Sequence, residues 1–100
     1  MNIHNKGTLV KFWLKHSDSK KNLELWYNDV GSKKWEKPSD VICDFATADI
    51  IANSRVVFNI KGNKYRLVAG INYQKGWLFI KFIGSHAEYD KIDVEKIEAY

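Results

Sequence analysis

The sequence predicts an α+β fold in which a helical half precedes a half made of strands. Apolar residues recur at helical spacing between residues 9 and 30, and from residue 55 they alternate with polar residues at a period of two. The chain has 100 residues, which suits one domain covering residues 1–100. Since 45% of the residues are hydrophobic, there is enough apolar material for one core, and we expect a globular protein.

The helical half should contain two main helices. The first is expected over residues 6–16, with Asn5 as a possible cap, because one helical face carries Leu9, Phe12, Trp13 and His16. The second follows the SDS run at 17–19 and ends near Gly31, because the same spacing recurs at Leu23, Trp26, Tyr27 and Val30. We expect these two helices to form a hairpin, and a short third helix to begin at Pro38.

The strand half predicts a three-stranded antiparallel meander, which a short strand at residues 2–4 can join. A two-residue turn at Gly62-Asn63 suits a type II′ hairpin and sets Lys61 opposite Lys64 and Asn59 opposite Arg66. These four side chains should then share one face. The third strand is expected over residues 77–83, with Lys81 facing outward and three residues facing the core: Leu78, Ile80 and Phe82.

The positive charge of the chain is concentrated in this strand half. The net charge is +4, but the segment from residue 50 to residue 87 contains no Asp or Glu and carries Arg55, Lys61, Lys64, Arg66, Lys75 and Lys81. This asymmetry indicates a polyanion as partner. The alternative is that long lysine side chains at a hairpin tip only extend into water.

The same composition argues against several other classes of protein. The basic segment lacks carboxylates for Mg²⁺, and His4, His16 and His86 are too scattered for a zinc motif, so we expect no metal and no cofactor. Cys43 is the only cysteine, which excludes an intrachain disulfide and favours a reducing cytoplasm. No apolar run reaches the length of a signal peptide or a membrane span, so we expect no membrane partner.

A cluster of chemically versatile residues follows the third strand in the stretch GSHAEYDK at 84–91. Metal-free cleavage of RNA needs a base for the ribose 2′-OH proton, cations for the phosphate and an acid for the leaving 5′ oxygen. The residue types fit these roles at His86, Arg66, Lys61, Lys64 and Tyr89. The alternative is a polar turn that only ends the strand.

Several motifs closely resemble the HigB family of toxins, mRNA interferases of the RelE superfamily. They are RVVFNIKGNKYRLV at 55–68, INY at 71–73 and SHAEYDKID at 85–93, together with Trp35, Pro38 and Asp40. The resemblance extends over essentially the whole chain. It departs from the family pattern at Ala46, where Pro is expected, and at Ser85, where Thr is usual.

The resemblance implies a RelE-like fold, with two N-terminal helices packed on a curved antiparallel sheet. It also implies a toxin that cuts mRNA on the translating ribosome without a metal and that forms a hetero-oligomer with a HigA-like helix-turn-helix antitoxin. The implied catalytic residues are Arg66, His86, Tyr89 and Lys64. The implied RNA-binding residues, taken with the basic segment, are Arg55, Asn59, Lys61 and Lys81.

Other interpretations stay open from sequence alone. The same basic face suits a non-catalytic RNA-binding or DNA-binding module, and a degenerate toxin could retain only antitoxin binding. Asp90 can orient His86 or Arg66, or it can cap the following segment, whereas Glu88 is expected to be a solvated surface residue.

Overall fold

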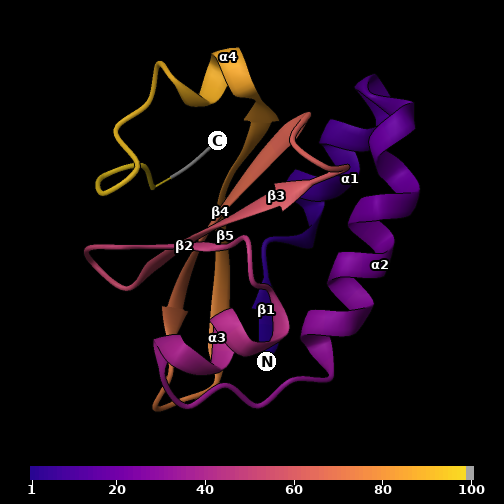
Figure 1. Cartoon of the computed structure of the whole chain (residues 1–100). Coiled ribbons are helices and arrows are strands. Elements are labelled where there is room, and N and C mark those ends of the chain that lie inside the picture. Colours follow the sequence, from indigo (N-terminus) through magenta and orange to yellow (C-terminus); the bar gives the residue numbers. More distant parts are fainter. Residues whose placement is uncertain (99–100) are drawn as a thin grey trace.

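A five-stranded mixed sheet forms the centre of the protein in the computed structural model, which describes residues 1–98; the last two residues of the predicted domain lie outside this range (Figure 1). The strand order is β1-β5-β4-β3-β2. The elements in chain order are β1 (Asn2–His4), α1 (Lys6–Lys15), η1 (Ser17–Ser19), α2 (Lys20–Gly31), α3 (Pro38–Asp44), β2 (Asp49–Ile51), β3 (Arg55–Ile60), β4 (Tyr65–Asn72), β5 (Trp77–Ser85) and α4 (His86–Tyr89).

The structure confirms the α+β class and the expected short strand at residues 2–4, but the sheet is mixed, whereas an antiparallel sheet was expected. Strands β2 to β5 pair antiparallel to their neighbours, but β1 pairs parallel to β5, with Ile3 beside Leu78. Strand β2 was not expected from the sequence, because it has only three residues and two of them are exposed. Strand β2 therefore widens the sheet beyond the meander and the short strand that the sequence predicts.

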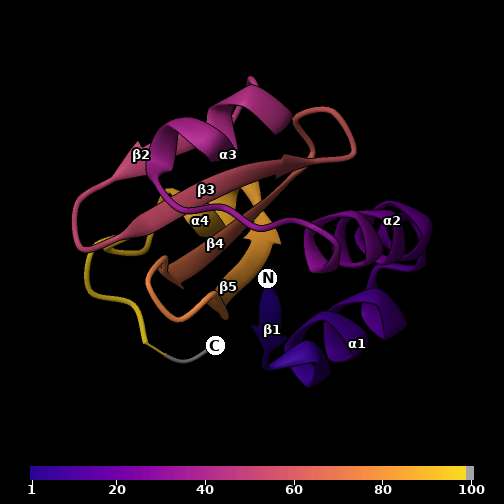
Figure 2. The ribbon, with the colours of Figure 1, turned by 90° about the horizontal axis from the view of Figure 1, so that it is seen from below.

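Helices α1 and α2 pack together on one face of the sheet, and residues 91–98, which we call the C-terminal strap, lie on the other side (Figure 2). The helices are amphipathic, as their apolar spacing predicts. Leu9 from α1, together with Leu23 and Val30 from α2, is fully buried in a core shared with β3, β4 and β5. Asn5 is not the side-chain cap of α1, since its amide donates to the carbonyl of Ile80 at 3.4 Å.

The other face of the sheet has a small apolar cluster of its own. Val57, Val68 and Phe82 form it, and the residues that cover it are Ile51, Tyr89, Ile92, Val94 and Ile97. The prediction that Phe82 faces the same core as Leu78 and Ile80 was wrong. A register shift pairs Val68 with Phe82 but Ala69 with Ile80, so Lys81 is an extra residue that reverses the alternation along β5.

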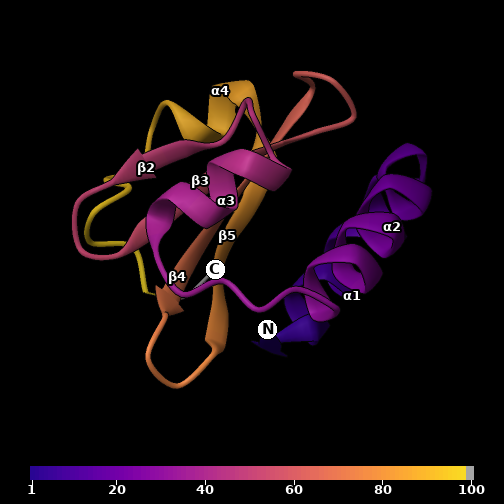
Figure 3. The ribbon, with the colours of Figure 1, turned by 60° about the horizontal axis from the view of Figure 1, so that its bottom comes forward.

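The β3–β4 turn and α4 lie at the same end of the sheet (Figure 3). The predicted pairing of Asn59 with Arg66 is confirmed, and the last pair before the turn joins Ile60 to Tyr65. Lys61 and Gly62 both have positive φ angles, of 55° and 65°.

Within the described chain the longest helix has 12 residues, and none has the length and apolar character that a membrane span requires.

Candidate active site

The candidate active site lies where β5 ends and α4 begins. Ser85 and Glu88 form a capping box: the Ser85 hydroxyl accepts from the Glu88 amide at 3.2 Å, and the Glu88 carboxylate accepts from the Ser85 amide at 2.8 Å. This arrangement fixes the first turn of α4, which carries His86 and Tyr89. Glu88 is exposed, as expected, and in addition it has a structural role, because it caps the start of α4.

The sheet register brings Arg66 beside this turn. Arg66 on β4 pairs with Gly84 on β5, and Tyr65 pairs with Ser85, so His86 follows directly on the neighbouring strand. The Nη2 atom of Arg66 lies 3.1 Å from Nε2 of His86. The guanidinium also lies over the ring of Tyr89, 5.0 Å from its centroid. Three of the four predicted catalytic residues therefore meet at one point.

A chain of polar contacts runs from Asp90 through His86 to Arg66. A carboxylate oxygen of Asp90 lies 3.3 Å from Nδ1 of His86, on the opposite side of the ring from Arg66. Arginine can only donate hydrogen bonds, so Nε2 must accept, and the ring proton resides on Nδ1 and points to Asp90. Of the roles left open for Asp90, this geometry supports orientation of His86.

Arg66 retains donors beyond those used by His86. Its Nη2 atom also donates to the side-chain oxygen of Asn63 at 3.3 Å. Its Nε atom is buried and finds no hydrogen-bond partner among residues 1–98. A buried unpaired donor is unfavourable, and this nitrogen is shielded from solvent in the free protein.

Lys64 and Lys61 do not join this site. Lys64 lies 2.5 Å from a carboxylate oxygen of Asp18, and Lys61 lies 3.6 Å from the same oxygen. Tyr65 donates to the other oxygen of Asp18 at 2.7 Å. The prediction that both lysines share a face with Arg66 was therefore wrong, because Asp18 in η1 draws them to the helical side of the sheet.

Asp18, Lys64 and Tyr65 shift one another's pKa values. Hydrogen bonds from Lys64 and then Tyr65 hold the pKa of the Asp18 carboxyl well below its ordinary value. The same hydrogen bond from Lys64 to Asp18 raises the pKa of Lys64. Burial, and then Asp18, raise the pKa of Tyr65. In this structure Lys64 is thus a fully charged ion-pair partner.

The remaining predicted RNA-binding residues are also engaged by the protein. The Asn59 amide donates to the carbonyl of Thr47 at 3.2 Å. Arg55 is buried under the C-terminal strap, and Lys81 lies 3.0 Å from a carboxylate oxygen of Glu98. Arg55 is thus a buried cation that contacts the protein itself, and its assignment to RNA binding stays a prediction. No group of three or more His, Cys, Asp or Glu residues within residues 1–98 could hold a metal ion.

The sequence analysis missed Asp18, Glu98 and the role of Glu88. The Ser85-x-x-Glu88 spacing is a capping-box signature and could have revealed the third of these. Asp18 and Glu98 had no such signal, because their contacts join segments far apart in the chain. Asp18 is 46 residues from Lys64, and Glu98 is 43 residues from Arg55.

Comparison with known proteins relates the chain to one family of toxins. The chain is 28% identical over 94 residues to the mRNA interferase HigB of Escherichia coli O6:H1 strain CFT073, and the alignment covers 92% of this chain and 91% of that protein. Residues 19–92 match the family model of the HigB toxin, described as the RelE-like toxic component of a toxin–antitoxin system. These residues include α2, the whole β2–β5 region and α4. The chain therefore belongs to the HigB family of RelE-like toxins.

Proposed function

We propose that this chain is an endoribonuclease toxin that cleaves mRNA on the translating ribosome without a metal ion. The observation that carries the proposal is the Asp90–His86–Arg66 chain of contacts beside Tyr89. It combines a group that exchanges protons at neutral pH with a cation suited to phosphate. The related protein from Escherichia coli is named an mRNA interferase.

The proposed reaction is attack of a ribose 2′ oxygen on the adjacent phosphorus. Nε2 of His86 takes the 2′-OH proton, a bond forms between the 2′ oxygen and phosphorus, and the bond to the 5′ oxygen breaks. The products are a 2′,3′-cyclic phosphate and a 5′ hydroxyl, whose oxygen receives a proton. In free protein Arg66 donates to Nε2, so the arriving phosphate must draw the guanidinium away and free this nitrogen.

Arg66 and Tyr89 would stabilise the charge that develops on the phosphate. The Arg66 guanidinium offers several donors in a fixed plane, which suits the non-bridging oxygens. Tyr89 lies beneath this plane and its ring centroid is 6.5 Å from that of His86. Its hydroxyl is our candidate for donating a hydrogen bond or a proton to an oxygen of the reacting phosphate. Asp90 is a positioning residue that holds the ring of His86.

Four other cations of the basic segment form ion pairs within the protein, and this supports dependence on the ribosome. Lys61 and Lys64 are paired with Asp18, and Arg55 and Lys81 are paired with Glu98. Arg66 is therefore left with few neighbouring charges to hold a flexible RNA strand. We propose that the ribosome supplies the missing orientation by presenting mRNA to the site, which places the toxin in the cytoplasm.

A HigA-like helix-turn-helix antitoxin is the proposed inhibitor. A toxin of this family is the toxic component of a toxin–antitoxin system. Leu14 on α1 and Leu25 on α2 are 75% and 59% exposed, so the helical pair offers apolar surface to a partner. Covering the Arg66–His86 site, distorting it, or packing on the helical pair would each silence the toxin within a stable complex.

The proposal is tested by inducing the protein in a bacterial host with and without the neighbouring gene and mapping mRNA 5′ ends. We expect growth arrest and new 5′ ends within translated regions, and both should disappear with the neighbouring gene. Purified protein should cut ribosome-bound mRNA and leave naked RNA intact. Equal cleavage of naked RNA would contradict ribosome dependence, and RNA binding without any cleavage would indicate a non-catalytic module.

A further inference from the structure

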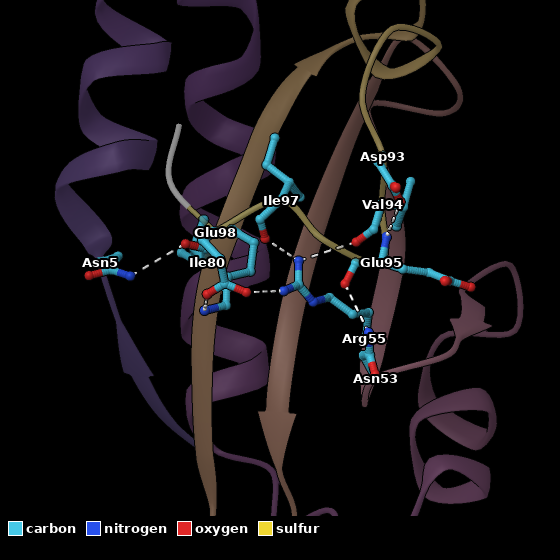
Figure 4. A network of polar contacts seen from close by, with 10 residues as sticks. Asn5, Asn53, Arg55, Ile80, Asp93, Val94, Glu95, Ile97 and Glu98 are labelled. Carbon is cyan, nitrogen blue, oxygen red and sulfur yellow. Dashed lines mark hydrogen bonds and ion pairs between the residues drawn. The ribbon is translucent and has the colours of Figure 1, made fainter.

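A second polar site lies on the same face of the sheet as Arg66, between the strap and strands β3–β5. It is a pocket of about 330 Å³ lined in part by Arg55, Gly70, Lys81, Glu95 and Glu98. Figure 4 shows the guanidinium of Arg55 enclosed by the strap. The catalytic proposal makes no use of this pocket.

Arg55 is the fixed part of the pocket. Its side chain is only 5% exposed, and its Nη1 atom donates to the carbonyls of Val94, at 3.2 Å, and Ile97. Its Nη2 atom donates to a carboxylate oxygen of Glu98 (Figure 4). The two backbone carbonyls hold the Arg55 guanidinium in place. The edge that carries Nη2 therefore faces the carboxylate of Glu98, which is an anion.

Lys81 is the second cation at this position. It is the extra residue of the β5 register shift, and its amine lies 3.0 Å from the other carboxylate oxygen of Glu98. The side chain lies across Gly70, where an added Cβ would come within 3.1 Å of the Lys81 Cε atom. The strand partner of Gly70 is Arg55. The missing side chain at Gly70 therefore lets Lys81 lie beside Arg55.

Glu98 is the exposed part of the pocket, in contrast to Arg55. Its carboxylate bridges both cations, and Lys81 first and Arg55 second hold its pKa below the ordinary value. Yet its side chain is 69% exposed, so the carboxylate can leave towards solvent without moving the sheet. A buried guanidinium and an ammonium that converge on one exposed carboxylate form an arrangement that also suits a phosphate.

We propose that Arg55 and Lys81 form a phosphate-binding subsite for the RNA backbone, and that Glu98 occupies this subsite in the free protein. RNA phosphate would replace the carboxylate and leave the backbone contacts of Arg55 in place. The identity of the ligand rests on the proposed function. Both cations were assigned to RNA binding from the sequence, and the structure adds that one of them is buried and that a single carboxylate pairs with both.

The test compares two substitutions that remove the same charge from the same strap. Glu98→Gln removes the negative charge that competes with phosphate at the subsite, whereas Glu95→Gln removes an exposed carboxylate that lines the pocket without bridging the cations. Binding of a single-stranded RNA oligonucleotide would be measured by fluorescence anisotropy over a series of salt concentrations. We expect Glu98→Gln to bind about 3- to 10-fold more tightly than Glu95→Gln, and its log–log salt slope to be steeper by about 0.7 for each additional phosphate that the protein binds.

A further substitution tests whether the tighter binding comes from the pocket. Lys81→Gln in the Glu98→Gln background should abolish most of the increase in affinity. Equal affinities for Glu98→Gln and Glu95→Gln, or an increase that survives Lys81→Gln, would overturn the subsite. Cleavage assays on ribosomes separate the two proposals: a toxin that cleaves mRNA but shows no such increase lacks the subsite, and an increase without cleavage would leave the subsite standing and refute the nuclease.

Discussion

Arg66 and His86 are 20 residues apart in the chain, yet the Nη2 atom of Arg66 lies 3.1 Å from Nε2 of His86. Two features produce this contact: the pairing of Arg66 with Gly84, and the capping box that begins α4 at His86. Because Arg66 can only donate hydrogen bonds, Nε2 of His86 must be the acceptor. The pair thus presents a proton acceptor and a cation side by side.

Arg66→Ala should remove most mRNA cleavage while the fold survives. Arg66 is partly buried near the start of β4, a central strand of the sheet, and lies outside both apolar clusters. Loss of one positioned donor to a developing charge lowers catalysis by roughly 10² to 10³. The measurement is single-turnover cleavage of a defined mRNA on programmed ribosomes, with circular dichroism to verify folding.

Arg66→Lys is the matched control, since it keeps the charge but loses the planar set of donors. We expect it to recover only part of the activity. Full toxicity of Arg66→Ala at equal expression would exclude Arg66 from the reaction.

Asp90→Asn should slow cleavage by about tenfold, because the carboxylate orients the ring of His86 without touching the substrate. Its oxygen lies 3.3 Å from Nδ1, and the exposed position makes it dispensable for folding. Binding of the toxin to ribosomes should stay unchanged. Asp90→Glu should restore part of the rate, which a purely helix-capping role would not explain; an unaltered rate in Asp90→Asn would remove Asp90 from the site.

Periodicity predicted the parts of the fold that depend on local sequence. Both main helices and the third helix lie within a few residues of the expected bounds, because each has an amphipathic face or a proline at its start. The pairing of Asn59 with Arg66 follows from the short turn between their strands. The position of His86 beside Arg66 follows from the same antiparallel order.

Features that depend on contacts between distant segments could not be predicted in this way. The register shift at Lys81 leaves no mark in the run WLFIKFI, where apolar residues lie on both sides of it. The strap brings Glu98 to Arg55, and η1 brings Asp18 to Lys64. Both carboxylates lie outside the basic segment, so its charge pattern suggested exposed cations where the structure has ion pairs.

Asp18→Asn should reduce stability at neutral pH and leave the catalytic residues in place. The pKa of Asp18 in the folded protein lies below its ordinary value of 3.8, so the unfolded state binds more protons between these two values. The stability from Asp18 is therefore fully present above about pH 4 and is lost as the pH falls towards the folded pKa. Because the pair with Lys64 is partly exposed, solvent screening limits the effect to a modest fall in melting temperature.

Thermal unfolding between pH 7 and pH 3 measures this effect. The gap between Asp18→Asn and the parent should be largest near neutral pH and should narrow below about pH 4. Asp49→Asn, which removes an exposed carboxylate on β2, is the control and should change the melting temperature less. A constant gap across the whole range would mean that the charge of Asp18 does not contribute.

His86→Gln should lower the cleavage step by roughly 10²-fold or more, as expected for a general acid–base group, while ribosome binding stays nearly unchanged. Gln can still reach the neighbourhood of Arg66, but it cannot exchange a proton. Tyr89→Phe should have a smaller effect, because the ring beneath the Arg66 guanidinium is retained and only the hydroxyl is lost. The measurement is single-turnover cleavage on programmed ribosomes between about pH 5.5 and pH 8.5, where an imidazole changes its charge. Parental rates and an unaltered pH profile for His86→Gln would show that this histidine only ends the strand, and the proton transfers would then have to be assigned to another residue.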